Sequence, residues 1–155
     1  MIKAYKPKMC DLWFREKLLS DEKTMSYNAA WGGTIPFPNE KWAKWYSKWL
    51  EAPEYKRYYR YLYEADIDSF VGEIAYHYDE KRKIHICDVI VLSEYRNRGF
   101  GTAGTKLICK AAKGNGISVL YDDIAGDNPS YKLFLKNGFE VVGKSDGIIT
   151  VKKIL

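Results

Sequence analysis

The chain has 155 residues, of which 46% are hydrophobic and 29% charged, and a net charge of +5. This length suits one folded unit with its own core, so we expect a single domain over residues 1–155. The composition excludes a largely disordered chain, and no apolar run approaches the ~18 residues of a membrane span. The mild basic excess is spread along the chain and does not indicate nucleic acid. Because no apolar leader is visible, we expect a cytoplasmic protein with neither a nucleic-acid nor a membrane partner.

The cysteines Cys10, Cys87 and Cys109 are odd in number and widely spaced. This pattern argues against a disulfide framework. We predict reduced, buried thiols that pack rather than react, and no metal site.

The N-terminal segment predicts a short strand over residues 2–6 and a helical stretch over 8–20. In that stretch Met9, Leu12 and Trp13 recur at helical spacing. Residues 26–38 contain two adjacent glycines and two prolines, so we expect a loop there.

A second helix is expected to begin at Asn39, a residue type that favours the N-cap position. It carries the strongest amphipathic face of the chain, formed by Trp42, Trp45, Tyr46, Trp49 and Leu50. We interpret these aromatics as packing against a sheet rather than as a stacking platform for a ligand.

Three β-type runs follow, over residues 57–65, 69–78 and 83–92. The turns between them are short enough for antiparallel neighbours. The first run is rich in tyrosine and arginine, as an RNA-stacking surface would be, but alternating aromatics also suit a half-buried strand. We favour the strand.

The remainder predicts a glycine loop, a helix over 101–113, and a buried strand over 117–121. Asn128-Pro129 is expected to start a short helix that stops at Gly138. Two final strands, near 139–143 and 148–155, complete the chain.

The glycine loop spans Arg96–Gly104, between a strand and a helix, and carries two arginines. Glycines allow close backbone approach, a helix N-terminus presents free N–H groups, and arginines suit phosphate, so a pyrophosphate fits all three features. The glycines also match the dinucleotide fingerprint G-x-G-x-x-G. Polar residues separate them from the preceding strand, however, and too little chain follows for the remaining βαβ units.

The same loop resembles the acyl-CoA site of the GNAT superfamily of N-acetyltransferases, with Arg96, Gly99 and Gly101 at the signature positions. Downstream, Asn128, Phe134 and Gly138 are similar to the family's second cofactor element. The elements predicted above follow the order β-α-α-β-β-β-α-β-α-β-β, which is the order of this family. The resemblance implies an α+β fold with a mostly antiparallel sheet and a parallel pair near the cofactor cleft.

The resemblance also implies acetyl-CoA as the cofactor. The backbone at Val89 and Val91 would pair with the pantetheine arm, and N–H groups of Arg98–Thr102 would hold the pyrophosphate. The implied cofactor-binding residues are Val89, Val91, Arg96, Asn97, Arg98, Gly99, Phe100, Gly101, Thr102 and Asn128.

An amine must lose a proton before it attacks a thioester, so the enzyme needs a base. Asp88 is the first candidate, because it interrupts the apolar run Ile86–Leu92. A carboxylate in a strand that is otherwise buried is expected to have a function or an oppositely charged partner. The stretch from Asp88 also resembles spermidine/spermine N-acetyltransferases, which carry an acid here. Pairing with a basic side chain is the structural alternative. Glu73 and His85 are weaker catalytic candidates.

Many GNAT enzymes carry a tyrosine as general acid where this chain has Phe134. Tyr131, one helical turn earlier, is the candidate substitute.

The acceptor amine is expected between the strand ends and the aromatic segment of residues 26–50. Tyr27, Trp31 and Phe37 are candidate lining residues, since aromatic faces attract cations. A hydrophobic plug or a homodimer contact is the alternative role for these residues. Asp122 and Asp123, expected at the end of their strand, would attract a cation or cap a turn.

These observations predict an acetyl-CoA-dependent N-acetyltransferase acting by direct attack on a small amine, diamine or antibiotic-like cation. Two alternatives stay open: a protein N-acetyltransferase, and a non-catalytic CoA-binding sensor or interaction module.

Overall fold

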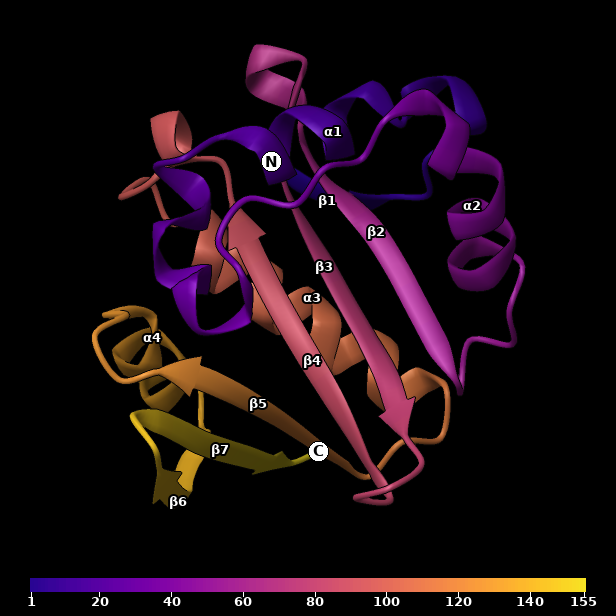
Figure 1. The fold of residues 1–155 in the computed structure, drawn as a ribbon. Helices are drawn as coiled ribbons and strands as arrows, with labels where there is room; N and C mark the ends of the chain where they lie inside the picture. The colour runs from indigo at the N-terminus through magenta and orange to yellow at the C-terminus, as the bar shows by residue number, and fades with distance from the viewer.

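We describe residues 1–155 from a computed structural model (Figure 1). One sheet of seven strands has the order β1-β2-β3-β4-β5-β7-β6. The strands are β1 Ile2–Tyr5, β2 Arg57–Glu64, β3 Ser69–Asp79, β4 Ile84–Val91, β5 Val119–Ala125, β6 Glu140–Ser145 and β7 Ile148–Ile154. The α-helices are α1 Trp13–Ser20, α2 Trp42–Leu50, α3 Phe100–Gly114 and α4 Ser130–Lys136. This order confirms the predicted α+β fold. No helix is long and apolar enough to cross a membrane.

Strands β4 and β5 form the parallel pair. These two strands pair at only two positions, His85 with Leu120 and Ile86 with Tyr121. Every other pair of neighbouring strands in the sheet is antiparallel. Beyond these residues the two strands diverge, as Figure 1 shows. The split leaves one edge of β4 without a strand partner.

Helix α3 covers one face of the sheet, and α1 and α2 lie on the other (Figure 1). A side chain at Gly104 of α3 would meet Leu62 and Val89 at 3.0 Å and Ile74 at 3.2 Å. This glycine therefore lets the helix lie close to the strands. On the opposite face, Trp45 of α2 packs edge-on against Tyr59 of β2 at 4.7 Å, as the amphipathic pattern predicts.

The first 41 residues depart from three expectations. A 3₁₀ turn over Met9–Asp11 precedes α1 and changes the helical phase, so Met9 and Trp13 are exposed while Phe14 and Leu18 are buried. Asn39 does not cap α2, because a further 3₁₀ turn, Asn39–Lys41, comes first. Cys10 is exposed, although the other two cysteines are buried as predicted, and all three are free.

Two further segments were predicted wrongly. The expected loop over 26–38 begins as a 3₁₀ helix, η2 Thr24–Trp31, which continues until Gly32 adopts a φ of 105°. Strand β5 was expected to stop at residue 121 but runs to Ala125, because Asp122 and Asp123 are accommodated within it. Both changes shape the site described next.

Candidate functional site

The larger cleft, about 590 Å³, lies where α3, α4 and the free edge of β4 meet. The residues that line it are Thr24, Tyr27, Val89, Ile90, Val91, Tyr95, Arg96, Asn97, Gly99, Phe100, Gly101, Thr102, Asn128, Pro129, Ser130, Leu133 and Phe134. We call it the cofactor cleft. It brings together all the sequence-predicted cofactor residues except Arg98.

The N-terminus of α3 supplies donors to this cleft. Gly99 precedes the helix with a φ of 83°, and Ala103 N–H is the first to donate back into the helix, to Gly99 O. The earlier N–H groups of Phe100, Gly101 and Thr102 have no helical acceptor. They lie on the cleft wall at the positive end of the helix dipole, an arrangement suited to phosphate.

The free edge of β4 supplies a second set of backbone groups. Leu92 N–H donates to Val71 O of β3, and backbone groups alternate in direction along a strand. The N–H and C=O of Val89 and Val91 therefore point to the split rather than to β3. An extended ligand arm could pair with them as a strand would.

The two loop arginines differ in position. Arg96 Nη2 donates to Thr24 O at 2.9 Å, and its Nη1 donates to Lys23 O at 3.3 Å. Arg98 is exposed and lies 5.6 Å from the Tyr95 ring, outside the cleft lining. Arg96 thus fastens η2 to the glycine loop, a role the sequence does not reveal.

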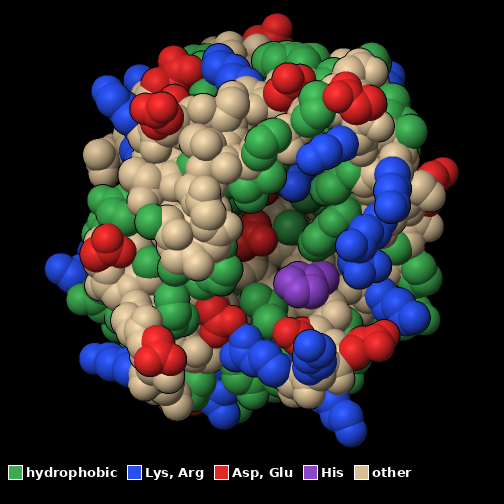
Figure 2. Space-filling model, viewed as in Figure 1, with side chains coloured by type: hydrophobic (Ala, Val, Ile, Leu, Met, Phe, Trp, Pro, Cys, Tyr) green, Lys and Arg blue, Asp and Glu red, His purple; other side chains and the backbone are tan.

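A smaller cleft of about 140 Å³ adjoins the first and shares part of its wall. Asp88, Asp122 and Asp123 contribute carboxyl groups, and Tyr27 and Trp31 of η2 contribute aromatic rings. We call it the acidic cleft. Figure 2 shows this side of the molecule hollowed between η2 and α2, with acidic side chains in the hollow.

Asp88 is the most unusual group of the acidic cleft. Its Oδ1 is buried without a hydrogen-bond partner. Burial, and then the negative charge of Glu73, raise the pKa of Asp88 to about 7, against a lowering effect of Arg15. A carboxyl group with this pKa exists in both protonation states near neutral pH, as a general base requires.

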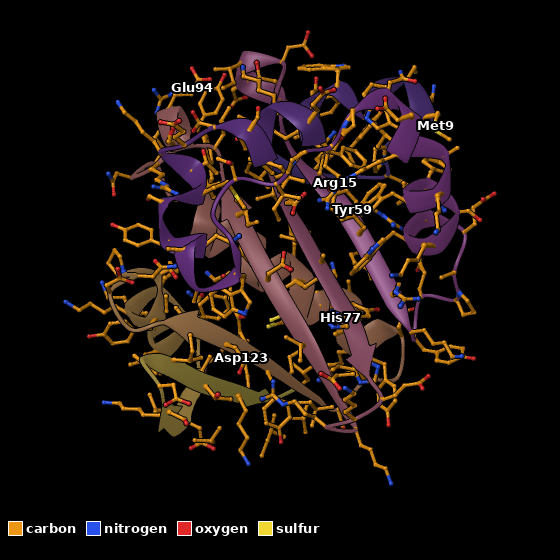
Figure 3. All side chains as sticks on the ribbon, viewed as in Figure 1. Met9, Arg15, Tyr59, His77, Glu94 and Asp123 are labelled. Carbon is orange, nitrogen blue, oxygen red and sulfur yellow. The ribbon has the colours of Figure 1, made fainter.

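The adjacent aspartates of β5 have opposite environments. Asp122 is 8% exposed, and no other side chain donates to its carboxyl group. Burial and the charge of Asp88 raise its pKa, against the lowering effect of a hydrogen bond from the Asp123 backbone. Asp123, labelled in Figure 3, pairs with Arg82 at 2.5 Å and accepts from Thr150 at 2.8 Å. Burial favours a higher pKa for Asp123, but these hydrogen bonds outweigh it and lower the pKa. Asp122 is therefore the carboxyl group available to a ligand.

Besides Arg98, four predicted site residues lie outside both clefts. His85 is at the other end of β4, where its Nε2 is 2.7 Å from Tyr55 O. Phe37 is buried beside Trp42 and Trp45, and Tyr131 packs against the main core. Glu73 is 3% exposed and bound by Arg15. Sequence reasoning placed these residues by strand or helix position, which does not reveal the distance from the split.

The sequence matches the model of the Acetyltransferase (GNAT) family over residues 16–139. This chain belongs to the GNAT acetyltransferase family. Membership confirms the predicted N-acetyltransferase class and acetyl-CoA as the acetyl donor. A search of curated proteins found no match.

Solved GNAT structures share the whole fold at low sequence identity. A ribosomal-protein-alanine N-acetyltransferase from Brucella melitensis has a TM-score of 0.78 at 19% identity, over 100% of this chain and 99% of that one. A spermidine N-acetyltransferase from Vibrio cholerae, in complex with CoA and spermine, has a TM-score of 0.80 at 15% identity, over 99% of this chain and 95% of that one. PaiA N-acetyltransferase from Thermoplasma acidophilum, in complex with coenzyme A, has a TM-score of 0.72 at 14% identity, over 100% of this chain and 99% of that one.

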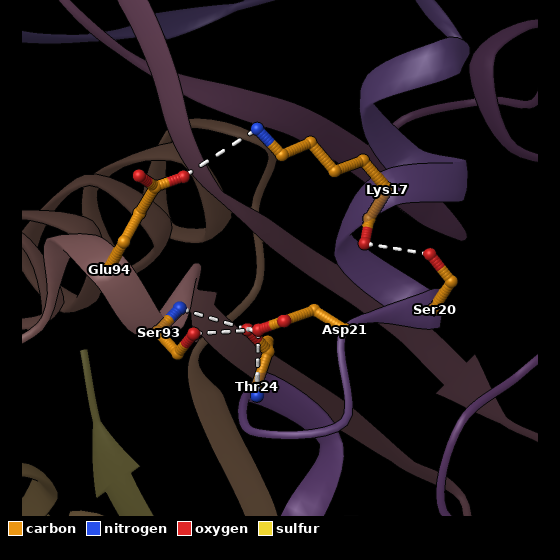
Figure 4. A network of polar contacts seen from close by, with 6 residues as sticks. All are labelled: Lys17, Ser20, Asp21, Thr24, Ser93 and Glu94. Atoms are coloured by element: carbon orange, nitrogen blue, oxygen red, sulfur yellow. Dashed lines mark hydrogen bonds and ion pairs between the residues drawn. The ribbon is translucent and has the colours of Figure 1, made fainter.

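One polar network of this GNAT domain was not foreseen. Asp21 Oδ2 accepts from Ser93 Oγ at 2.7 Å and from Thr24 N at 3.0 Å, and Ser93 N donates to Thr24 Oγ1 at 2.9 Å (Figure 4). The spacing of Asp21 and Thr24 is typical of a side chain that accepts from the backbone three residues later, and this part of the network could have been predicted from it. Together with Arg96, this network holds the aromatic wall η2 against the segment that follows β4.

Proposed function

We propose that residues 1–155 form one N-acetyltransferase domain that acetylates the primary amine of a small cation by direct attack, with Asp88 as the general base. The observation that carries the proposal is that the acidic cleft adjoins the cofactor cleft and is lined by Asp88, whose Oδ1 is buried without a hydrogen-bond partner. A cation is favoured because Asp122 adds a second carboxyl group and Tyr27 and Trp31 add aromatic faces.

The cofactor cleft suits acetyl-CoA. The first turn of α3 would bind the pyrophosphate through backbone N–H groups, and Val89 and Val91 would pair with the pantetheine arm. Asn128 shapes the adjoining wall, since its Oδ1 accepts from Ser130 N at 2.9 Å and caps α4. When bound, acetyl-CoA supplies the acetyl group as an activated thioester. The backbone N–H of Val91 would stabilise negative charge that develops on the carbonyl oxygen.

In the proposed reaction, Asp88 removes a proton from the acceptor ammonium and the amine nitrogen bonds to the acetyl carbon. The carbon–sulfur bond breaks, and a water molecule takes the second proton from the nitrogen and gives a proton to the sulfur. Phe134, buried against both clefts, has no proton to donate at the position where many GNAT enzymes carry tyrosine. Proton transfer to sulfur therefore needs no side chain in this proposal.

A thiol-release assay over an amine panel tests the function. The panel contains monoamines, diamines, aminoglycosides and peptides with a free N-terminus. We expect turnover of small cations, which bring positive charge to the acidic cleft. Turnover of peptides alone would indicate a protein N-acetyltransferase. Tight CoA binding by calorimetry with no turnover of any member would indicate a non-catalytic CoA-binding module.

A further inference from the structure

A buried polar cluster lies behind the acidic cleft, on the sheet face that α1 and α2 cover. Arg15 of α1 donates from Nη1 to Glu73 Oε2 at 3.0 Å, and the Tyr59 hydroxyl donates to the same oxygen. The Arg15 guanidinium also lies over two aromatic rings, with its Cζ 4.4 Å from the centre of the Trp45 ring and 5.1 Å from the centre of the Phe37 ring. Figure 3 shows Arg15 and Tyr59 close together over the sheet.

The cluster is enclosed and charged. Glu73 is 3% exposed, and the Arg15 side chain is 16% exposed. A buried ion pair with a fixed geometry costs desolvation free energy, and replacing such pairs by apolar side chains is often neutral or stabilising. Stability alone therefore does not account for this arrangement.

The strand register places the cluster beside Asp88. Ala75 of β3 is opposite Asp88 of β4, and Glu73 is opposite Ile90, so Glu73 and Asp88 are diagonal neighbours on one face. Arg15 Nε and Asp88 Oδ1 are both buried without a hydrogen-bond partner, one a donor and the other an acceptor.

We propose that Arg15 is a positioning residue for acetyl transfer: anchored by Glu73 and Tyr59, its guanidinium holds a fixed positive charge that keeps the Asp88 carboxylate ionised for the incoming ammonium. The inference rests on the proposed role of Asp88 as the base. Arg15 itself lines neither cleft and contacts no substrate.

The charges around Asp88 act in opposite directions. Burial and Glu73 raise its pKa, and Arg15 lowers it. Across the split, Asp122 and Asp123 of β5 also face the acidic cleft. His77, labelled in Figure 3, lies on the same face of β3, opposite Ile86, and burial and Arg57 lower its pKa. Arg15 is thus the cation whose charge favours the ionised form of Asp88.

The test is the pH dependence of kcat/KM in Arg15→Met and Glu73→Gln. We expect the acid limb of the wild-type profile near pH 7, since Asp88 must be ionised. Arg15→Met should move this limb upward by about one to two pH units, the size expected when a nearby unit charge is removed at an effective dielectric constant near 20. Glu73→Gln should move it downward, because a negative charge is removed while the arginine remains.

A matched control is Arg60→Met. Arg60 also pairs with a glutamate, Glu54, at 2.6 Å and lies over a tyrosine ring, but it is on the opposite face of β2. Its loss should change stability without moving the acid limb. Arg15→Lys, which retains the charge, should return the limb toward that of the wild type even where Arg15→Met folds poorly.

A direct titration of the Asp88 carboxyl by carbon-13 NMR, in wild type and Arg15→Lys or Arg15→Met, gives a readout without turnover. An unchanged Asp88 titration and an unchanged acid limb in folded Arg15→Met would overturn the inference. If Asp88→Asn instead retains the activity and the acid limb of the wild type, the proposed base is wrong, and the two failures are thereby distinguished.

Discussion

The Ser93 hydroxyl donates to Asp21 Oδ2 at 2.7 Å across 72 positions of the chain. Through this bond the segment after β4, which leads into the glycine loop, holds the turn that begins η2. Arg96 makes a second attachment nearby, to Thr24 O. The wall of the acidic cleft is therefore tied to the loop of the cofactor cleft.

Ser93→Ala should weaken this attachment. We expect a loss of about 1 kcal/mol in unfolding free energy, the usual net value of one hydrogen bond. The KM of the acceptor should rise more than the KM of acetyl-CoA, because η2 contributes Tyr27 and Trp31 to the acidic cleft. Chemical denaturation and steady-state kinetics measure both. The control is Ser145→Ala, because this serine is exposed and its side chain makes a single long hydrogen bond, 3.5 Å to Asp146 Oδ2.

Acidification should remove part of the same stabilisation. Hydrogen bonds from Thr24 and Ser93 lower the pKa of Asp21 below its ordinary value of 3.8. A depressed folded-state pKa stabilises the protein above the unfolded-state pKa, and this contribution is lost as pH falls through the folded-state value. The difference in unfolding free energy between wild type and Asp21→Asn should therefore shrink below about pH 4. A constant difference down to pH 2 would contradict this account.

Asp88→Asn should lower kcat by about 10²–10⁴-fold if Asp88 is the base, with the Kd of CoA little changed. The folded-state pKa of Asp88 is raised, so ionisation costs stability, and that cost develops as pH rises from the ordinary value of 3.8 to about 7 and is constant at higher pH. Asp88→Asn should consequently be more stable than wild type at pH 8, with the advantage fading toward pH 4. A variant with wild-type kcat at every pH would remove Asp88 from the mechanism.

Asp122→Asn and Asp123→Asn should differ, although the residues are adjacent. The positive charge of a bound acceptor favours the ionised form of Asp122 against the raised pKa of the empty site. Asp122→Asn should therefore raise the KM of a cationic acceptor about 10–100-fold, the value of a hydrogen bond to a charged group. Asp123→Asn should mainly reduce stability, since it leaves Arg82 without its partner. Kinetics with a cationic acceptor and thermal denaturation of both variants compare these effects. Equal KM values for the two variants would contradict the assignment.

Gly101→Asp should abolish CoA binding. A side chain there would come within 2.9 Å of Leu133 Cδ2, and its negative charge would repel phosphate at the start of α3. Gly143→Asp is the matched control, because that glycine of β6 is exposed and has open space around it. Isothermal calorimetry with CoA measures both. Unchanged affinity in folded Gly101→Asp would mean that the pyrophosphate binds elsewhere.

Patterns among neighbouring residues were sufficient to predict much of the fold. The alternating aromatics of β2, the tryptophan face of α2 and the glycine loop before α3 are properties of contiguous residues. The order of such elements along the chain was enough to predict the α+β fold. The same patterns failed where a distant partner decides the conformation. Strand β5 continues through Asp123 because Arg82, from the turn before β4, compensates its charge.

The sequence by itself determined the family, the acetyl donor and the position of the glycine loop, because these depend on residue types at short, fixed spacings. Only the tertiary structure decided which carboxyl groups face one another. The pKa of Asp88 depends on Glu73 and Arg15, which strand register and helix packing bring to it from other parts of the chain. Electrostatic interaction depends on distance in space and on burial, and neither can be obtained from spacing along the chain.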